Sequence, residues 1–105
     1  MSQFEKFERG GDIAVLYSPG FGAGWYTWNS GEEGLLFDKE IVEAVLAGDT
    51  DKAVAVAERK YPGIYTGGGD DLAIAWVPKG CRFDVHEYDG NESVRVLGPD
   101  YGHLA

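Results

Sequence analysis

Sixteen of the 105 residues are glycine, about twice the usual share, and this excess limits how stable the folded chain can be. Glycine loses more conformational freedom on folding than any other residue, while a typical domain is stabilised by only about 5–15 kcal/mol. Three Trp, six Tyr and five Phe residues can offset that cost, since each aromatic side chain buries roughly 150–250 Å² when it packs. We therefore expect most aromatic residues to lie in a core.

The remaining composition is that of a single globular domain over residues 1–105, with peripheral segments at 1–11 and 98–105. Hydrophobic residues make up 44% and charged residues 26%, which excludes wholesale disorder. No apolar run approaches the ~18 residues of a membrane span, and the first residues lack the apolar segment of a secretory signal. We therefore expect a cytoplasmic protein that binds no membrane.

The charge balance restricts the partners of the chain. Eighteen acidic residues against nine basic residues give a net charge of −9, which repels phosphate groups. Direct, nonspecific binding to nucleic acid is therefore disfavoured. The single cysteine, Cys81, excludes an internal disulfide and any zinc site with several cysteines.

Two helices are predicted between residues 38 and 61. Asp38 is a natural N-cap, an apolar stripe follows it at helical spacing, and Gly48 ends the first helix. Residues 49–51 begin a second helix that runs to about Tyr61, where a Pro-Gly pair follows. The short connection between the two indicates a helical hairpin or a broken helix.

Five strands are predicted around these helices, from alternation and from short apolar runs bounded by turn residues. They span residues 12–18, 25–29, 72–77, 82–88 and 93–97. The last two are expected to form a hairpin, because the turn sequence Asp-Gly-Asn-Glu lies between them.

These elements predict an α+β fold with the chain order ββααβββ. Its centre is a single, mostly antiparallel sheet of about five strands, with a helical pair packed on one face. The hydrophobic strand at 93–97 has no following strand to cover it, so the sheet would have an open edge. A homodimer or higher homo-oligomer could cover that edge, unless the first strand or the N-terminal segment already does so.

Two glycine-rich loops are the candidate ligand-binding segments. The first contains Gly20, Gly22 and Gly24, but no Lys-Ser/Thr pair follows, and it leads into aromatic, β-prone residues. The helix N-terminus that attracts phosphate in P-loops and dinucleotide folds is therefore missing. The loop is either a flexible turn or bulge that another backbone approaches closely, or a segment that contacts a ligand.

The second loop, residues 63–71, contains three consecutive glycines. It is either a permissive connection between a helix and a strand or a loop whose exposed amides contact a ligand or a partner. Aromatic residues flank both loops, and flat rings beside free amides suit a planar ligand such as a purine, at roughly 1–3 kcal/mol per stacked base. The ligand-binding residues predicted here are Gly22, Gly24, Trp25, Tyr26, Trp28, Tyr65, Gly68, Gly69 and Asp70. Each aromatic residue of this set is nevertheless more often a core residue than a stacking platform.

Basic residues on the C-terminal hairpin could hold an anion. Arg82 and Arg95 are predicted there as ligand-binding residues, because a guanidinium binds phosphate through two parallel hydrogen bonds. The alternative is a solvent-exposed sheet face with ordinary cross-strand pairs.

No motif for catalysis or metal binding is recognisable. Cys81 and His86 are five residues apart, so a regular strand places them on opposite faces. Asp70 and Asp71 are adjacent and point in different directions, which disfavours joint chelation of one ion. We therefore predict a non-enzymatic protein without catalytic residues, metal site or cofactor.

Several segments resemble a family of small bacteriophage and bacterial proteins that has no assigned activity. The resemblance spans about residues 12–95 and rests on GFGAGWYTWN at 20–29, LFD at 36–38, GGDDL at 68–72, WVPKG at 76–80 and EYDG at 87–90. By analogy of size and context, it implies a phage counter-defence protein in the cytoplasm of a bacterial host.

Two functions of different classes follow as expectations. The first is a non-enzymatic protein that binds a small nucleotide-like ligand, such as a sponge that sequesters a cyclic nucleotide immune signal. The second is an acidic inhibitor that occludes the nucleic-acid-binding site of a host defence nuclease, since the chain carries a net charge of −9. A deep aromatic pocket would favour the first function, and a continuous carboxylate face without a pocket would favour the second.

Overall fold

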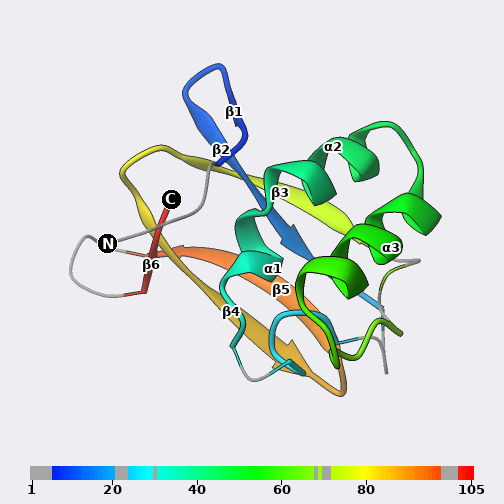
Figure 1. Cartoon of the computed structure of the whole chain (residues 1–105). Helices are drawn as coiled ribbons and strands as arrows, with labels where there is room; N and C mark the ends of the chain where they lie inside the picture. Colours follow the sequence, from blue (N-terminus) through cyan, green and yellow to red (C-terminus); the bar gives the residue numbers. More distant parts are fainter. Residues whose placement is uncertain (1–5, 21–23, 30, 68, 70–71, 98–101) are drawn as a thin grey trace.

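The computed structural model describes residues 6–20, 24–29, 31–67, 69, 72–97 and 102–105 (Figure 1). Within these residues the chain forms six strands and three helices. In chain order they are β1 (Glu8–Arg9), β2 (Asp12–Tyr17), α1 (Gly34–Phe37), α2 (Lys39–Leu46), α3 (Thr50–Lys60), β3 (Ala73–Pro78), β4 (Arg82–Tyr88), β5 (Asn91–Leu97) and β6 (His103–Leu104). The predicted α+β class is confirmed.

The strands form two antiparallel sheets, so the prediction of a single five-stranded sheet is wrong. One sheet has the order β1-β2-β3 and the other has the order β5-β4-β6. The chain changes sheets at the turn after β3, where the N–H of Lys79 donates to the carbonyl of Gly11, next to β2. The N–H of Gly80 donates to the carbonyl of Ala105, next to β6. These bonds hold the turn between the two sheets, and β4 pairs with β5 and β6 instead of returning along β3.

The β1-β2-β3 sheet is the central layer of the molecule. Alternate residues of β2 point to opposite faces, and Ala14 and Leu16 join a core cluster with the buried side chains of α2 and α3. Ile13 and Val15 join a second core cluster, which contains Phe83 of β4. The helical pair therefore covers one face of this sheet, as Figure 1 shows, and the β5-β4-β6 sheet packs against the other.

Both predicted helix starts are confirmed. The carboxylate of Asp38 accepts hydrogen bonds from two backbone N–H groups in the first turn of α2, and that of Asp49 accepts one in the first turn of α3. Such a cap stabilises a helix by about 1 kcal/mol, because the first N–H groups of a helix otherwise lack partners. Gly48, with a φ of +74°, ends α2 in the left-handed conformation that favours glycine.

The predicted C-terminal hairpin is also confirmed, with a tighter turn than expected. Asp89 and Gly90 have φ values of +51° and +84°, as a two-residue type I′ turn requires. The strands pair from Arg82 with Leu97 to Tyr88 with Asn91, so β5 begins earlier than predicted.

The predicted strand at 25–29 is wrong, because this segment forms turns. The backbone N–H of Asn29 donates to the carbonyl of Tyr26 at 3.2 Å, which is a bond within the segment and not to another strand. At the other end of the chain, residues expected to be peripheral pair with β4 as β6, and Ala105 is buried.

Candidate functional site

A buried carboxylate, that of Glu92 on β5, holds the loop between β2 and α1. Glu92 is 1% exposed, and its Oε1 accepts a hydrogen bond from the N–H of Ser18 at 3.0 Å. Its Oε2 accepts bonds from the N–H of Trp25 at 3.0 Å and from both the N–H and the Oγ1 of Thr27. The N–H of Glu92 donates in turn to the carbonyl of Ser18 at 2.7 Å. The loop therefore turns around Glu92 instead of extending as a strand.

Two exposed aromatic rings meet beside this loop. Trp28 and Tyr65 are 40% and 42% exposed, and their ring centroids lie 5.3 Å apart. Asn29 holds the backbone of Tyr65 in place, since its Nδ2 donates to the carbonyl of Tyr65 at 2.9 Å and its Oδ1 accepts the N–H of Tyr65 at 2.6 Å. The side chain of Asn29 therefore preorganises the two rings, which are called here the Trp28–Tyr65 pair.

Glycine allows both rings to lie close to the main chain. A Cβ at Gly24 would overlap the ring of Trp28, and a Cβ at Gly67 would overlap that of Tyr65. A Cβ at Gly69, in the second glycine loop, would likewise overlap a side chain of α3. The sequence predicts that another backbone approaches the first loop, but the group that lies close to the main chain at each of these three positions is a side chain. The predicted residues Gly22, Gly68 and Asp70 lie outside the described residues.

A carboxylate of the hairpin borders the Trp28–Tyr65 pair. The indole Nε1–H of Trp28 donates to Oε2 of Glu87 at 3.4 Å, and the same oxygen accepts the N–H of Gly90 at 2.7 Å. Glu87 therefore connects the turn of the β4–β5 hairpin to an exposed ring. Glu87 and Asn29 were not predicted as site residues, because each contacts the Trp28–Tyr65 pair through a residue far along the chain.

Trp25 is a core residue and not a stacking platform for a ligand. Core packing was the alternative given for each aromatic residue of the predicted set. Trp25 is fully buried, and its indole Nε1–H donates to the carbonyl of Leu35 at 2.8 Å. The indole thus connects the loop to α1 and does not face a ligand.

Tyr26 belongs to a cluster of titratable side chains beside β6. Its hydroxyl lies 3.0 Å from Nε2 of His103, and Nδ1 of His103 lies 3.9 Å from a carboxylate oxygen of Glu33. Burial raises the pKa of Tyr26, and the charge of Glu33 adds to the effect. Lys6 donates to the carbonyl of Leu104 at 2.7 Å, and burial lowers the pKa of its amine. The cluster fastens the C-terminal strand, and no local sequence signal predicts it.

Arg82 and Arg95 do not join the Trp28–Tyr65 pair. Both lie on the outer face of the β5-β4-β6 sheet, whose inner face carries the buried Phe83. A guanidinium nitrogen of Arg95 lies 3.1 Å from Oδ2 of Asp84, and one of Arg82 donates to the carbonyl of Gly102 at 3.2 Å. Arg95 therefore forms an ordinary cross-strand pair on an exposed sheet face, which was the alternative to anion binding.

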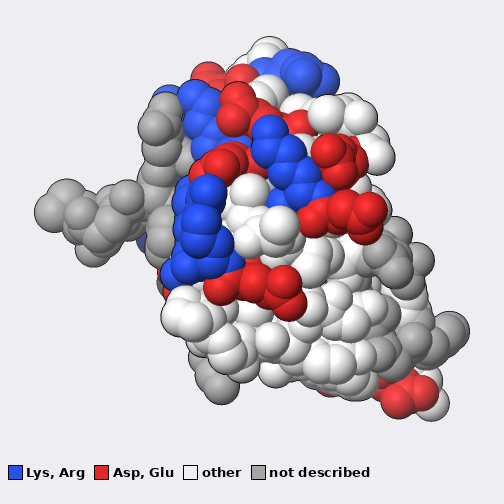
Figure 2. Space-filling model, turned by 45° about the vertical axis from the view of Figure 1, so that its right-hand side comes forward, with Lys and Arg blue, Asp and Glu red and all other residues white. Residues whose placement is uncertain are grey.

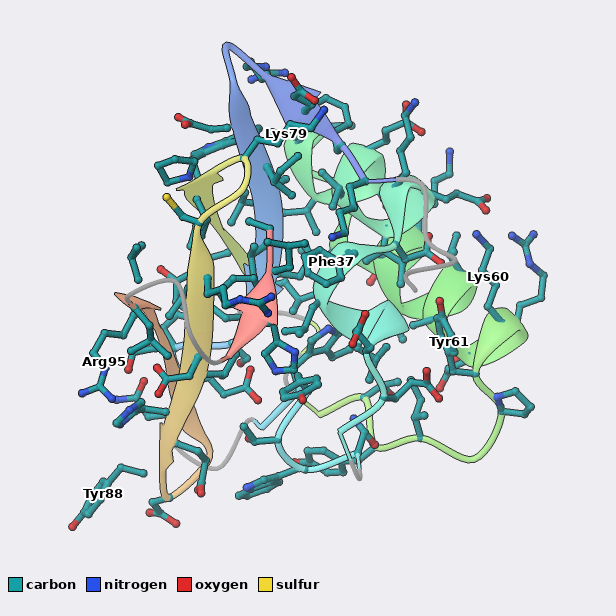
Figure 3. The ribbon with its side chains drawn as sticks, turned by 90° about the vertical axis from the view of Figure 1, so that its left-hand side faces the viewer. Phe37, Lys60, Tyr61, Lys79, Tyr88 and Arg95 are labelled. Carbon is teal, nitrogen blue, oxygen red and sulfur yellow. The ribbon has the colours of Figure 1, made fainter. Side chains whose placement is uncertain are left out.

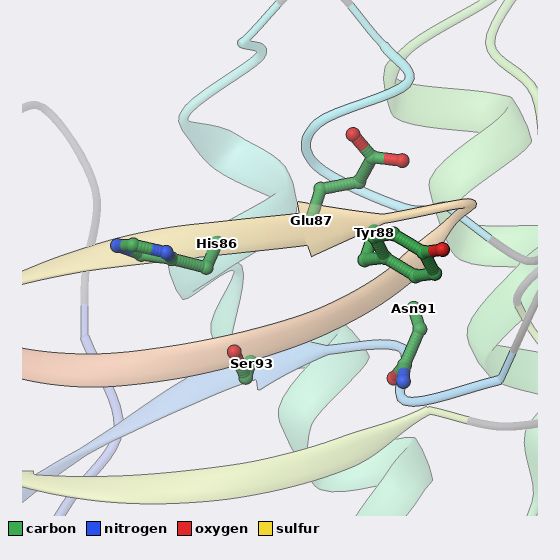
Figure 4. Close-up of a pocket in the computed structure, with 5 residues that line it drawn as sticks. All are labelled: His86, Glu87, Tyr88, Asn91 and Ser93. Atoms are coloured by element: carbon green, nitrogen blue, oxygen red, sulfur yellow. The ribbon is translucent and has the colours of Figure 1, made fainter.

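A shallow depression of about 210 Å³ lies beside the hairpin turn, and Figure 4 shows the side chains around it. It is lined by His86, Glu87, Tyr88, Asn91 and Ser93. Ligand pockets are usually about 300–1,000 Å³ and mainly apolar, so this polar depression is too small to enclose a nucleotide.

A network of ion pairs joins α2 to α3. The carboxylate of Asp38 accepts hydrogen bonds from the hydroxyl of Tyr61 at 2.9 Å and from the amine of Lys60 at 3.2 Å. Glu40 accepts bonds from Lys60 and Arg59, and these bonds lower the pKa of its carboxyl. Figure 3 shows Lys60 and Tyr61 on the side of the molecule opposite Arg95.

Figure 2 shows the face of the molecule on which α2 and α3 lie. On part of this face, basic and acidic side chains alternate. Another part of the same view carries neither Lys and Arg nor Asp and Glu among the described residues. The acidic residues therefore do not form one continuous carboxylate surface on this face.

No protein-family model matches the chain, and no curated protein or solved structure matches it. The resemblance to bacteriophage proteins therefore stays a prediction.

Among the residues that the structure describes, no group of three or more His, Cys, Asp and Glu side chains could hold a metal ion. In the same part of the chain, no helix has the length and apolar character needed to cross a membrane.

Proposed function

We propose that this chain is a non-enzymatic binding protein whose small ligand stacks a planar ring, such as a nucleobase, on the Trp28–Tyr65 pair. The observation that carries the proposal is that both rings are exposed, by 40% and 42%, while Asn29 holds the backbone beside them. A ring surface that is already ordered loses little entropy when a ligand stacks on it.

The neighbouring groups support recognition of the base. Stacking contributes about 1–3 kcal/mol per base, so polar contacts must add to it for tight binding. The carboxylate of Glu87 lies beside Trp28 and can accept a hydrogen bond from an exocyclic amino group, such as those of adenine and guanine. Arg82 and Arg95 lie on the outer face of the sheet, so they are not part of the proposed contact surface.

The bacteriophage resemblance suggests a biological role for such a protein. In that setting the ligand would be a cyclic nucleotide immune signal, and the protein would act as a sponge. On the face that Figure 2 shows, charges of both signs alternate, which is unlike the continuous carboxylate surface that a mimic of nucleic acid needs.

Titration calorimetry tests this proposal with cyclic di- and oligonucleotides, cyclic ADP-ribose isomers and the corresponding nucleosides. We expect binding at micromolar protein for at least one compound, and a loss of about ten-fold or more in Trp28→Ala. Leu46→Ala is the matched control, since it truncates another side chain that is 40% exposed, on α2, and should leave binding unchanged. No binding across the panel would overturn the proposal.

Recovery of the ligand separates binding from catalysis. We expect the bound compound to be released intact after the complex is denatured. A released product in place of the intact compound would show that the protein is an enzyme.

A further inference from the structure

One edge of β5 has backbone groups that point away from its sheet. In an antiparallel pair, the N–H and C=O groups of successive residues point alternately toward the partner strand and away from it. The N–H of Glu92 points away from β4, because it donates to the carbonyl of Ser18. By the same alternation, the backbone groups of Val94 and Val96 also point away from β4.

Only the start of this edge is covered within the described part of the chain. The bond from Glu92 to Ser18, the residue after β2, is the one backbone hydrogen bond in the described part of the chain that this edge of β5 makes. From Val94 to Leu97 no described strand pairs with this side of β5, because β5 is the outer strand in the order β5-β4-β6. Among the described residues, the edge of β5 from Val94 to Leu97 is therefore open, as the sequence predicts for this strand.

Apolar side chains lie along this edge of β5. Val96 is 51% exposed, although its cross-strand partner Phe83 is fully buried on the same face of the sheet. Val94 lies beside it and packs, half-buried, against the second core cluster. Natural edge strands are usually blocked by proline, lysine or a bulge, and β5 has no proline or lysine and pairs in unbroken register with β4.

We propose that the edge of β5 from Val94 to Leu97 pairs antiparallel with the same strand of a second copy of this chain. Two β5-β4-β6 sheets would then join across a two-fold axis. Val94 and Val96 each offer one N–H and one C=O, so the edge has equal numbers of donors and acceptors and is complementary to itself. The exposed side chain of Val96 would be covered by valine side chains of the second copy.

The charge pattern favours a second copy as the occupant of this edge. A net charge of −9 makes two copies repel each other wherever unpaired carboxylates meet. Along Val94 to Leu97 the one charged side chain is Arg95, and the carboxylate of Asp84 lies 3.1 Å from its guanidinium. The edge is therefore locally neutral, so two acidic chains can approach each other there at little electrostatic cost. A basic partner would instead be drawn to acidic surface elsewhere.

Light scattering after size-exclusion chromatography tests the proposal. At high micromolar concentration we expect a mass of twice the 11.4 kDa of one chain. Val96→Lys and Val96→Pro should both give monomers, the first by adding a charge and the second by removing the outward N–H, which an edge strand tolerates. Val96→Thr is the matched control, because it keeps the branched shape and the N–H, and it should remain a dimer.

Hydrogen exchange of single amides gives a readout on the unaltered chain. The amides of Val94 and Val96 should exchange more slowly at high than at low protein concentration. Those of Ser93 and Arg95, which point toward β4, should exchange at the same rate at both. A wild-type mass of 11.4 kDa at high concentration would overturn the proposal, even if a different protein were found to bind this edge. A folded Val96→Pro variant that dimerises as strongly as the wild type would also overturn it.

Discussion

Thr27 donates two hydrogen bonds to one carboxylate oxygen of Glu92, from its backbone N–H at 2.8 Å and from its Oγ1 at 2.7 Å. The two residues are 65 positions apart in the chain. Bonds to an ionised acceptor are about twice as strong as bonds between neutral groups. This contact decides the path of residues 24–29, and so it decides where the ring of Trp28 lies.

Replacement of Glu92 by glutamine should destabilise the fold by at least about 1–3 kcal/mol, because an amide cannot accept all the bonds that the carboxylate accepts. Thr27→Val removes only the hydroxyl bond and should cost about 0.5–1.5 kcal/mol. Glu43→Gln, at an exposed position of α2, is the control and should have no effect. Urea unfolding measures all three. Equal stability of Glu92→Gln and the wild type would show that the charge of the carboxylate is unimportant.

Removal of the Asp38 carboxylate should cost more than removal of the Asp49 carboxylate, although both cap helices. Asp49→Ala removes one capping bond, worth about 1 kcal/mol. Asp38→Ala also leaves the hydroxyl of Tyr61 and the amine of Lys60 without this acceptor, so its loss of unfolding free energy should be larger. Unfolding in urea compares the two variants, and equal losses would mean that the contacts to α3 contribute nothing.

The fold should become less stable as the pH rises above about 10, the usual pKa of tyrosine. Burial and the hydrogen bond to Asp38 raise the pKa of Tyr61. Above that pH the unfolded chain has lost the tyrosine proton while the folded chain keeps it, so the free energy of unfolding falls with increasing pH. Tyr61→Phe has no proton to lose, and its stability should fall less steeply in urea titrations above that pH. Identical slopes would contradict the prediction.

A methyl group at Gly24 should displace the ring of Trp28, because a Cβ there would overlap it. We expect Gly24→Ala to lose about 1–3 kcal/mol of stability and to increase the quenching of tryptophan fluorescence by acrylamide. In a Trp28→Ala background the same substitution should cost much less, since the ring is absent. If the loss is the same in both backgrounds, the overlap with Trp28 is not its cause.

Part of the candidate site could be predicted from residue chemistry alone. Trp28, Tyr65 and Gly24 were expected at a ligand-binding surface because they lie in or beside glycine loops, and the structure places them together. Arg82 and Arg95 were chosen for their charge, but the two-residue alternation of β4 and β5 places them on the outer face of the sheet. Which face of a hairpin meets the rest of the molecule depends on packing, which charge does not reveal.

The elements whose causes lie within a few residues can be predicted from local sequence. The caps at Asp38 and Asp49, the glycine at the end of α2 and the Asp89–Gly90 turn all act on neighbouring backbone groups. The division of the strands into two sheets and the turns of residues 24–29 depend instead on contacts between distant segments. Strand propensities differ by only about 1 kcal/mol, whereas each hydrogen bond to a charged group contributes about 1.5–3 kcal/mol. The distant carboxylate of Glu92 therefore outweighs the local preference of Trp25 and Thr27 for a strand.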